Sequence, residues 1–172
     1  MMKPLLAIAF VAVSISPRPA AAEQKFAHVD LRRALEESNE GKKAAAQLKA
    51  EFDKKQKELE QRQDELRKVK ADIDRQAATL KADALVAKQK ELEQRAVQLQ
   101  ESYVRLQREA QEKQASNTQR ITRQLSAIVA QIAQAQGLTY VLDSSVGLVF
   151  APPSLDLTSE LIRKYDSTPA TK

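Results

Sequence analysis

A long stretch without glycine or proline constrains this chain more than any other feature. Between residues 42 and 136 neither residue occurs, so no helix breaker interrupts the backbone there. Large apolar side chains recur in this stretch every seven residues, in two series: Phe52, Leu59, Leu66, Ile73 and Leu80, then Leu85, Leu92, Leu99 and Leu106. A period of seven is typical of helices that supercoil around a partner. The sequence therefore predicts a long coiled coil.

The two series differ in phase. Leu80 would be followed by an apolar residue at position 87, but the next large member of the pattern is Leu85. A chain reversal near residues 79–84 explains this shift, and residues 42–119 then form an antiparallel hairpin with arms about 70 Å long. One continuous helix of about 140 Å is the alternative. The hairpin is favoured because it brings the two ends of the chain together.

The apolar seam of this predicted hairpin is narrow. The positions four residues after the first series are polar or small: Gln56, Gln63, Lys70 and Ala77. We therefore expect a thin, flexible arm. In such an arm, the leucines of the seam face the neighbouring helix rather than another molecule: Leu59, Leu66, Leu92 and Leu99.

The ends of the chain supply a small body, from residues 23–41 and 120–165. A dense apolar stripe on the second arm marks where the helix enters this body: Ile121, Leu125, Ile128, Val129 and Ile132. Residues 25–30 are predicted to form a strand, and Asp30 to cap a short helix that ends at Leu35. Residues 38–41 are expected to separate that helix from the long one.

The second part of the body contains more strand-forming residues. Gly137 is placed to end the long helix, and residues 138–142 are predicted to form a strand. A turn at 144–147 is expected to return the chain as a second strand at 148–150. Asp156 then caps a final helix from Leu157 to Tyr165, and residues 166–172 are expected to form a flexible tail.

The predicted fold class is α+β and mostly helical, with a small β-containing oligomerisation body and a long antiparallel coiled-coil hairpin. Three short strands and a few helix ends are a small core, and small cores are usually completed by oligomerisation. We therefore expect the core residues to be buried in a homo-oligomer: Val29, Ile121, Leu125, Ile128, Ile132 and Val141.

The first 22 residues have the features of an export signal. Lys3 supplies a positive charge, an apolar run covers residues 5–15, and the small residues 20–22 form a cleavage site. The apolar run is too short to span a bilayer, which takes about 20 residues. Cleavage leaves 26 basic and 23 acidic side chains, a net charge of +3. The predicted location is the periplasm, with an uncleaved interfacial anchor as the alternative.

Composition argues against several kinds of chemistry. Three isolated glycines cannot build a phosphate-binding loop, and the absence of cysteine excludes thiolate nucleophiles and thiolate metal sites. The single histidine, His28, lies in a predicted strand and is expected to be a hydrogen-bonded structural residue. No nucleophile–base pair stands out from the helix-surface charges. We therefore predict a protein that is not an enzyme and has no catalytic residues, metal or cofactor.

Motifs at both ends of the chain resemble those of the Skp/OmpH family of periplasmic chaperones. Residues 29–31 with Leu35, Ser38 and Gly41 are similar to the family's opening strand and helix. Residues 138–143 resemble its central strand, and residues 156–158 with Leu161 and Ile162 resemble its closing capped helix. The resemblance covers the whole mature chain, and it rests on the order and spacing of these motifs.

The resemblance implies a homotrimer whose helical arms enclose a cavity for unfolded outer-membrane proteins. Such a holdase prevents their aggregation during transit to the outer membrane and uses no ATP. Lipopolysaccharide has been proposed as a ligand in the family, and three basic residues lie in about the right part of the second arm: Arg105, Arg108 and Lys113.

Lysines on the arm are the predicted cationic contacts to client proteins, because an excess of positive charge speeds the capture of acidic clients. They are Lys54, Lys55, Lys57, Lys68, Lys70, Lys88 and Lys90. The alternative for each is an ordinary solvated helix face. Two other functions share some of these features: a structural coiled-coil spacer of the cell envelope, and a basic nucleic-acid-binding protein. Export argues against the second, so no nucleic-acid partner is expected.

Overall fold

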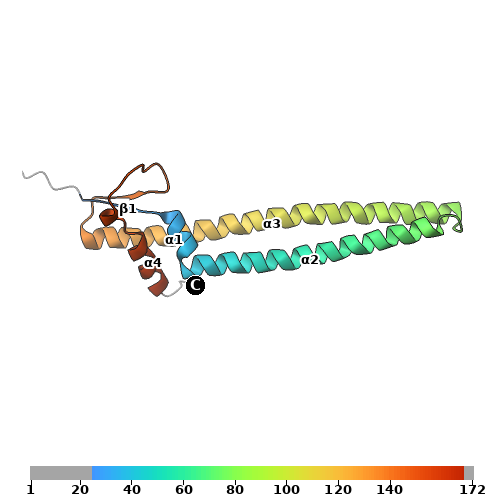
Figure 1. Cartoon of the computed structure of the whole chain (residues 1–172), viewed down its shortest axis with the longest axis horizontal. Coiled ribbons are helices and arrows are strands. Elements are labelled where there is room, and N and C mark those ends of the chain that lie inside the picture. Colours follow the sequence, from blue (N-terminus) through green and yellow to red (C-terminus); the bar gives the residue numbers. More distant parts are fainter. Residues whose placement is uncertain (1–24, 169–172) are drawn as a thin grey trace, which may run out of the picture.

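The computed structural model describes residues 25–168, and it consists of a small body and one long helical arm (Figure 1). The elements follow in the order β1, α1, α2, α3, β2, a 3₁₀ turn at Pro153–Leu155, and α4. The predicted α+β, mostly helical class is confirmed, with 78% of the structure helical. The predicted signal peptide, residues 1–22, lies outside the described residues.

The arm is a hairpin of two antiparallel helices. Helix α2 spans Asn39–Gln76 and α3 spans Ala82–Gln136, so the continuous-helix alternative is wrong. The chain reverses at residues 77–81, where the amides of Thr79 and Leu80 both donate to the Gln76 carbonyl at 3.0 Å. Backbone hydrogen bonds therefore close this turn without glycine or proline.

Helix α3 is one unbroken helix that passes from the tip of the arm into the body. It ends where Gly137 adopts a left-handed conformation (φ 64°), and the Leu138 amide donates to the Ala133 carbonyl at 2.9 Å. A left-handed residue after the last turn is a common helix end that glycine adopts without strain. The prediction that Gly137 ends this helix is confirmed.

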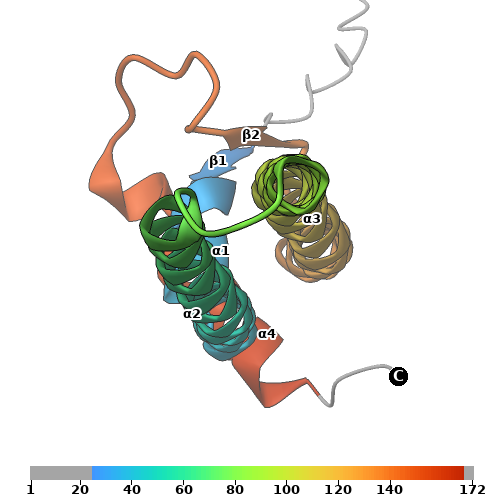
Figure 2. The same cartoon turned by 90° about the vertical axis from the view of Figure 1, so that its right-hand side faces the viewer.

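The sheet joins the two ends of the chain. Strand β1 (Phe26–Val29) pairs in parallel with β2 (Tyr140–Asp143), with Phe26 opposite Tyr140. On its other edge β1 makes a single bridge, from His28 to Asp156. Figure 2 shows both strands beside the body end of α3, with the chain after β2 extending away from the helices.

Helix α1 (Leu31–Glu37) and helix α2 are separated by one residue. Asp30 caps α1 as predicted, because its carboxylate accepts from the Arg33 amide at 2.8 Å. Ser38 caps α2 and accepts from the Gly41 amide at 3.2 Å. The expected break over residues 38–41 was therefore too long: α2 begins at Asn39 because the buried Ser38 side chain satisfies its first turn.

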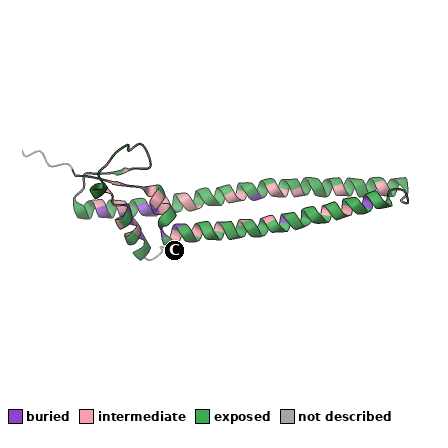
Figure 3. Ribbon diagram, viewed as in Figure 1, coloured by how far each residue is buried: buried purple, intermediate pink, exposed green. Residues whose placement is uncertain are grey.

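The core of the body lies between α3, α1 and α4 (Thr158–Ser167). Figure 3 shows the buried positions gathered in the body and scattered along the arm. The residues of this core are Val29, Ala34, Ile121, Leu125, Ile128, Ile132, Leu161 and Tyr165. Val141 is half-buried and packs against it.

A single chain buries most of the residues that we expected to need a second chain. Val29 is 3% exposed, Ile128 5% and Ile132 2%. The premise that one chain is too small to bury them was wrong, because it underestimated α4, whose Leu161 and Tyr165 belong to the same core; their place in a homo-oligomer stays a prediction.

The predicted second strand at 148–150 does not form. Residues 148–150 have no strand pairing, and the side chains of Val149 and Phe150 are 99% and 83% exposed. After β2 the Ser144 amide continues the parallel ladder by donating to the Val29 carbonyl at 2.8 Å, and the chain next meets the sheet at Asp156, on the other edge of β1. The outer edge of β2 therefore has no strand partner among residues 25–168.

The final helix is longer than predicted. Helix α4 ends at Ser167, so the expected tail at 166–172 begins too early, and its last four residues lie outside the described residues. The predicted cap by Asp156 is wrong, because α4 begins one residue later than expected and its cap position is Leu157; the Asp156 carboxylate instead accepts from the Thr158 amide at 2.8 Å, just before the cap.

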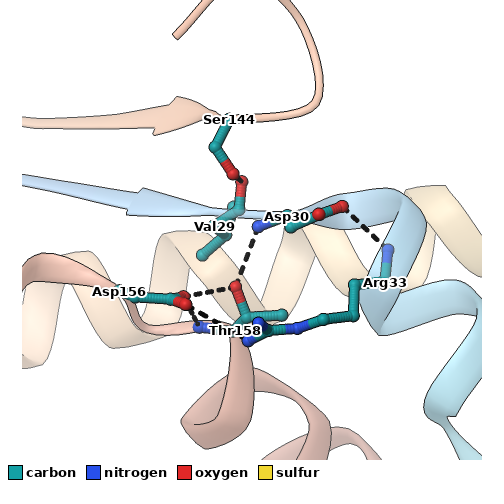
Figure 4. A network of polar contacts seen from close by, with 6 residues as sticks. All are labelled: Val29, Asp30, Arg33, Ser144, Asp156 and Thr158. Carbon is teal, nitrogen blue, oxygen red and sulfur yellow. Dashed lines mark hydrogen bonds and ion pairs between the residues drawn. The ribbon is translucent and has the colours of Figure 1, made fainter. Parts of the chain in front are cut away.

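A polar network ties the start of α4 to the start of α1 (Figure 4). Thr158 is fully buried; its hydroxyl accepts from the Asp30 amide at 2.9 Å and donates to Asp156 at 2.5 Å. Asp156 also pairs with Arg33 at 3.2 Å. Burial alone would raise the pKa of Asp156, but the hydrogen bonds from Thr158 and the charge of Arg33 hold that pKa below its usual value.

His28 differs from the prediction of a hydrogen-bonded residue. Both of its ring nitrogens are buried and have no hydrogen-bond partner within the described chain. Its partner across the sheet is Leu142, an apolar residue that offers no hydrogen bond to the ring.

Candidate functional site

The arm is the largest surface of the molecule, and its two halves are held together differently. Near the body, ion pairs link the two helices: Glu40 with Arg120, Glu51 with Lys113, and Lys55 with Glu109 at 2.5 Å. The Glu51–Lys113 and Lys55–Glu109 pairs are largely exposed, so each contributes little to stability, whereas Glu40 is half-buried. In the distal half, the ion pairs of the described residues all lie within one helix.

The apolar seam is as narrow as its sequence predicts. Leu59, Ile73 and Leu106 are buried between the helices, whereas Leu66, Leu92 and Leu99 are only half-buried. A narrow seam holds the helices together without covering their outer faces. Most of the surface of each arm helix is therefore exposed.

A cleft opens between the helices in the middle of the arm. It has a volume of about 390 Å³ and is lined by Leu66, Val69 and Leu99, with Arg62 and Arg105 among its charged residues. It lies just beyond the last of the ion pairs that link the two helices. Beyond Lys55 the two helices are therefore joined by the apolar seam, in which Ile73 is buried, and by no further ion pair among residues 25–168.

A row of exposed valines follows one face of α3. Val86, Val97 and Val104 are 62%, 53% and 48% exposed. Their separations of 11 and 7 residues are close to whole numbers of helical turns, so the three side chains lie along one line about 27 Å long. The heptad positions alone do not reveal this row, although the spacing of its three valines is visible in the sequence. Isolated apolar side chains between charges can make weak, distributed contacts.

The body carries a second exposed apolar surface. Phe26 and Tyr140 stack across the sheet with ring centroids 5.4 Å apart, and each is about half exposed. Val146, Val149 and Phe150 are 77%, 99% and 83% exposed on the chain after β2. Large apolar side chains that stay this exposed are candidates for contact with another molecule.

Comparison with known families decides what kind of protein carries this arm and body. The family model described as outer membrane protein (OmpH-like) matches residues 25–165, which is most of the chain. The chain belongs to the OmpH-like family. The match covers the arm and both parts of the body.

A solved structure shares this OmpH-like fold. It is a protein from Caulobacter crescentus CB15, described as a candidate outer membrane chaperone (OmpH-like). The two chains are 22% identical with a TM-score of 0.79, and the similarity covers 90% of this chain and 91% of that one. At this identity the likeness shows the fold. No curated protein matches the chain.

The predicted client-binding lysines are spread along the OmpH-like arm rather than brought together. Lys55 pairs with Glu109, Lys70 pairs with Asp74 at 2.8 Å, and Lys88 donates to Gln76 at 3.2 Å. The other predicted lysines have no ion pair within residues 25–168: Lys54, Lys57, Lys68 and Lys90. Those four are exposed and therefore the more available for contact with another molecule.

The three basic residues considered for lipopolysaccharide do not form one cluster. Lys113 is paired with Glu51, Arg105 lines the cleft in the middle of the arm, and Arg108 is exposed. Within the described part of the chain, no group of three or more His, Cys, Asp or Glu residues is placed to hold a metal ion. No helix there is long and apolar enough to cross a membrane.

Proposed function

We propose that this chain is an ATP-independent holdase of the periplasm that binds unfolded outer-membrane β-barrel proteins between helical arms. The observation that carries the proposal is the row of exposed valines on an arm that buries little apolar surface of its own. Membership of the OmpH-like family supports it, as does the description of the structural neighbour as a candidate chaperone.

Weak contacts are what a holdase needs. Burying one apolar side chain gives at most about 1.5–3 kcal/mol, so no single valine traps a client, and several together give useful affinity. The exposed lysines add attraction for acidic clients and speed the encounter. Neither kind of contact requires a nucleotide or a chemical step, so the proposal contains no enzyme activity and no cofactor.

The exposed apolar surface of the body supports assembly into a homo-oligomer, for which a trimer is our proposal. A second copy can pair with the free outer edge of β2 and cover Val149 and Phe150. Several copies then place several arms around one client and raise the effective concentration of binding groups. The predicted signal peptide supports the periplasmic location.

The test is light scattering from an aggregating client. A urea-unfolded outer-membrane barrel protein is diluted into buffer without nucleotide, with and without the mature chain. We expect aggregation to be abolished at about one oligomer per client, and high salt to weaken the protection. If the client aggregates unchanged at every ratio, the holdase proposal fails and an envelope spacer becomes the better account.

Two matched triple variants identify the contact surface. Replacing Val86, Val97 and Val104 by threonine keeps the β-branched shape and removes apolar surface. The control replaces Gln94, Gln107 and Gln114, three exposed polar positions of α3 that lie beside the valine row and not on it, by the same residue. We expect protection to fall several-fold in the valine variant and to stay unchanged in the control. Equal protection by both variants would contradict the role of the valine row.

A further inference from the structure

The two helices of the arm are attached to the body in different ways. Helix α3 continues into the core, where Ile121 and Leu125 are at most 1% exposed. Helix α2 begins at Asn39, directly after the cap residue Ser38, and contributes only Ala44 to the periphery of the core. The contacts of its first turns therefore decide how α2 leaves the body.

Helix α4, the last helix described, supplies the most specific of those contacts. Tyr165 is 7% exposed, and its hydroxyl hydrogen-bonds to the Glu40 carboxylate on α2 and lies 2.8 Å from Gln124 Oε1 on α3. Arg120 of α3 donates to the same Glu40 carboxylate. One carboxylate on α2 is thus shared by α3 and α4.

The residue after Tyr165 adds a second contact. The Asp166 carboxylate accepts from the Asn39 amide at 2.9 Å, at the first residue of α2. Amides of the first turn have no partner inside a helix, and a negative charge there interacts favourably with the helix dipole. Two consecutive residues of α4 therefore hold two consecutive residues of α2.

The electrostatics of Glu40 and Tyr165 agree with this geometry. Burial alone would raise the pKa of Glu40, but the hydrogen bonds from Tyr165 and Arg120 outweigh it and lower that pKa. Burial raises the pKa of the Tyr165 hydroxyl well above its usual range, and the adjacent Glu40 carboxylate raises it further. At neutral pH the pair is therefore a neutral donor facing a charged acceptor, which is a strong hydrogen bond.

Apolar packing does not take over the role of these contacts at the same place. A cleft of about 640 Å³ lies between α2, α3 and α4 and reaches Tyr165 and Asp166. Polar residues such as Gln47, Asn117 and Gln131 form much of its lining. The polar contacts therefore bridge a region in which the three helices are not closely packed.

We infer that Tyr165 and Asp166 are positioning residues through which α4 sets the direction of α2 relative to the body. Without them, α2 stays joined through Ser38, the close approach of Gly41 to Leu35 and the seam, but its first turns move more freely against α3 and α4. The consequence for client capture rests on the proposed function: in an oligomer, the direction of each arm sets the size of the space between arms.

The test measures the distance between α2 and α4 directly. The chain has no cysteine, so spin labels can be attached at two introduced cysteines, Lys57→Cys on α2 and Arg163→Cys on α4, both exposed positions. Labelled chains are diluted with an excess of unlabelled chains so that only distances within one chain are measured. A second pair, Arg123→Cys with Arg163→Cys, reports on α3 and α4 alone.

The variants distinguish loss of the contacts between α4 and α2 from a general loss of the fold. Tyr165→Phe keeps the buried ring and removes the hydroxyl, and Asp166→Ala removes the second contact. The control Gln136→Ala removes a different contact of α4, the hydrogen bonds of 3.0 and 3.1 Å from α3 to Glu160, without touching α2.

We expect the double variant Tyr165→Phe, Asp166→Ala to broaden the α2–α4 distance distribution at least twofold and to leave the α3–α4 distribution unchanged. The control should change neither. An α2–α4 distribution as narrow as that of the parent chain would overturn the inference, and so would equal broadening of both pairs. The distance measurement does not depend on the scattering assay. Failure of the inference about Tyr165 and Asp166 is therefore distinguishable from failure of the holdase proposal.

Discussion

Replacing Gly41 by alanine tests a close approach between α1 and α2. In an open helix this change stabilises by about 1 kcal/mol, because glycine is the poorer helix former. Here a Cβ atom on Gly41 would lie 1.7 Å from the carbonyl oxygen of Leu35 and 3.0 Å from the Ser38 hydroxyl. Carbon and oxygen atoms in contact are normally about 3.3–3.6 Å apart, so α1 and α2 would have to separate by about 1.6–1.9 Å.

The loss of stability caused by Gly41→Ala depends on which groups can move to relieve the clash. The clashing atom belongs to the backbone of α1, and that helix is held by Ala34, which is fully buried. Overpacking costs about 1–3 kcal/mol, and loss of the Ser38 cap costs about 1 kcal/mol. After subtraction of the gain in helix propensity, Gly41→Ala should lower the free energy of unfolding by about 2 kcal/mol, which is roughly 4–8 °C in Tm.

The assay is urea unfolding of the mature chain, followed by circular dichroism. The control is Lys42→Ala, an exposed change in the same turn, which should alter the free energy of unfolding by less than about 0.5 kcal/mol. If Gly41→Ala proves as stable as the parent chain or more stable, helix propensity dominates, and the close approach of α1 and α2 is not as described.

Three further predictions address the core, pH and assembly. Leu125→Ala, in the fully buried core, should lower the free energy of unfolding by about 2–5 kcal/mol, whereas Val86→Ala on the exposed arm should change it by less than about 0.5 kcal/mol; similar losses in urea unfolding would contradict the placement of the core. The pKa of Glu40 is lower in the folded chain than its usual value, so the stabilisation by Glu40 is complete above the usual pKa and is lost as the pH falls through the folded pKa. The urea midpoint should therefore fall less between about pH 5 and pH 3 in Glu40→Gln than in the parent chain, and equal slopes would argue against the contribution of Glu40. Phe150→Ser removes an exposed apolar side chain and should shift the oligomer toward monomer in sedimentation velocity at a given concentration, while an unchanged sedimentation coefficient would place the assembly surface elsewhere.

Much of the arm could be predicted because its signals are local and repeated. A heptad repeat reports which face of a helix is covered, and a change of its phase reports a reversal. The reversal occurs at residues 77–81, close to the phase change between Leu80 and Leu85. Capping by Asp30 and the helix end at Gly137 were predictable for the same reason, since each depends on one residue and its nearest neighbours.

The body was harder to predict because its contacts join distant parts of the chain. Residues 148–150 have strand-forming side chains, but a strand also needs a partner edge, and the chain after β2 returns to the sheet only at Asp156. The contribution of α4 to the core was underestimated because Leu161 and Tyr165 become core residues only when α4 packs on α3. The contact of Tyr165 with Glu40 joins residues 125 positions apart and leaves no local pattern.

The parallel pairing of β1 with β2 also determines the order in which the molecule can fold. The Lys25 amide donates to the Thr139 hydroxyl across 114 residues of sequence, and closing a loop of that length early would carry a large entropic penalty and be slow. The turn at residues 77–81 needs no such closure, and each pair of contacts added along the seam shortens the remaining loop. Folding is therefore expected to begin at the tip and proceed toward the ends, so that the sheet, the last part to form, completes only after nearly the whole chain has emerged.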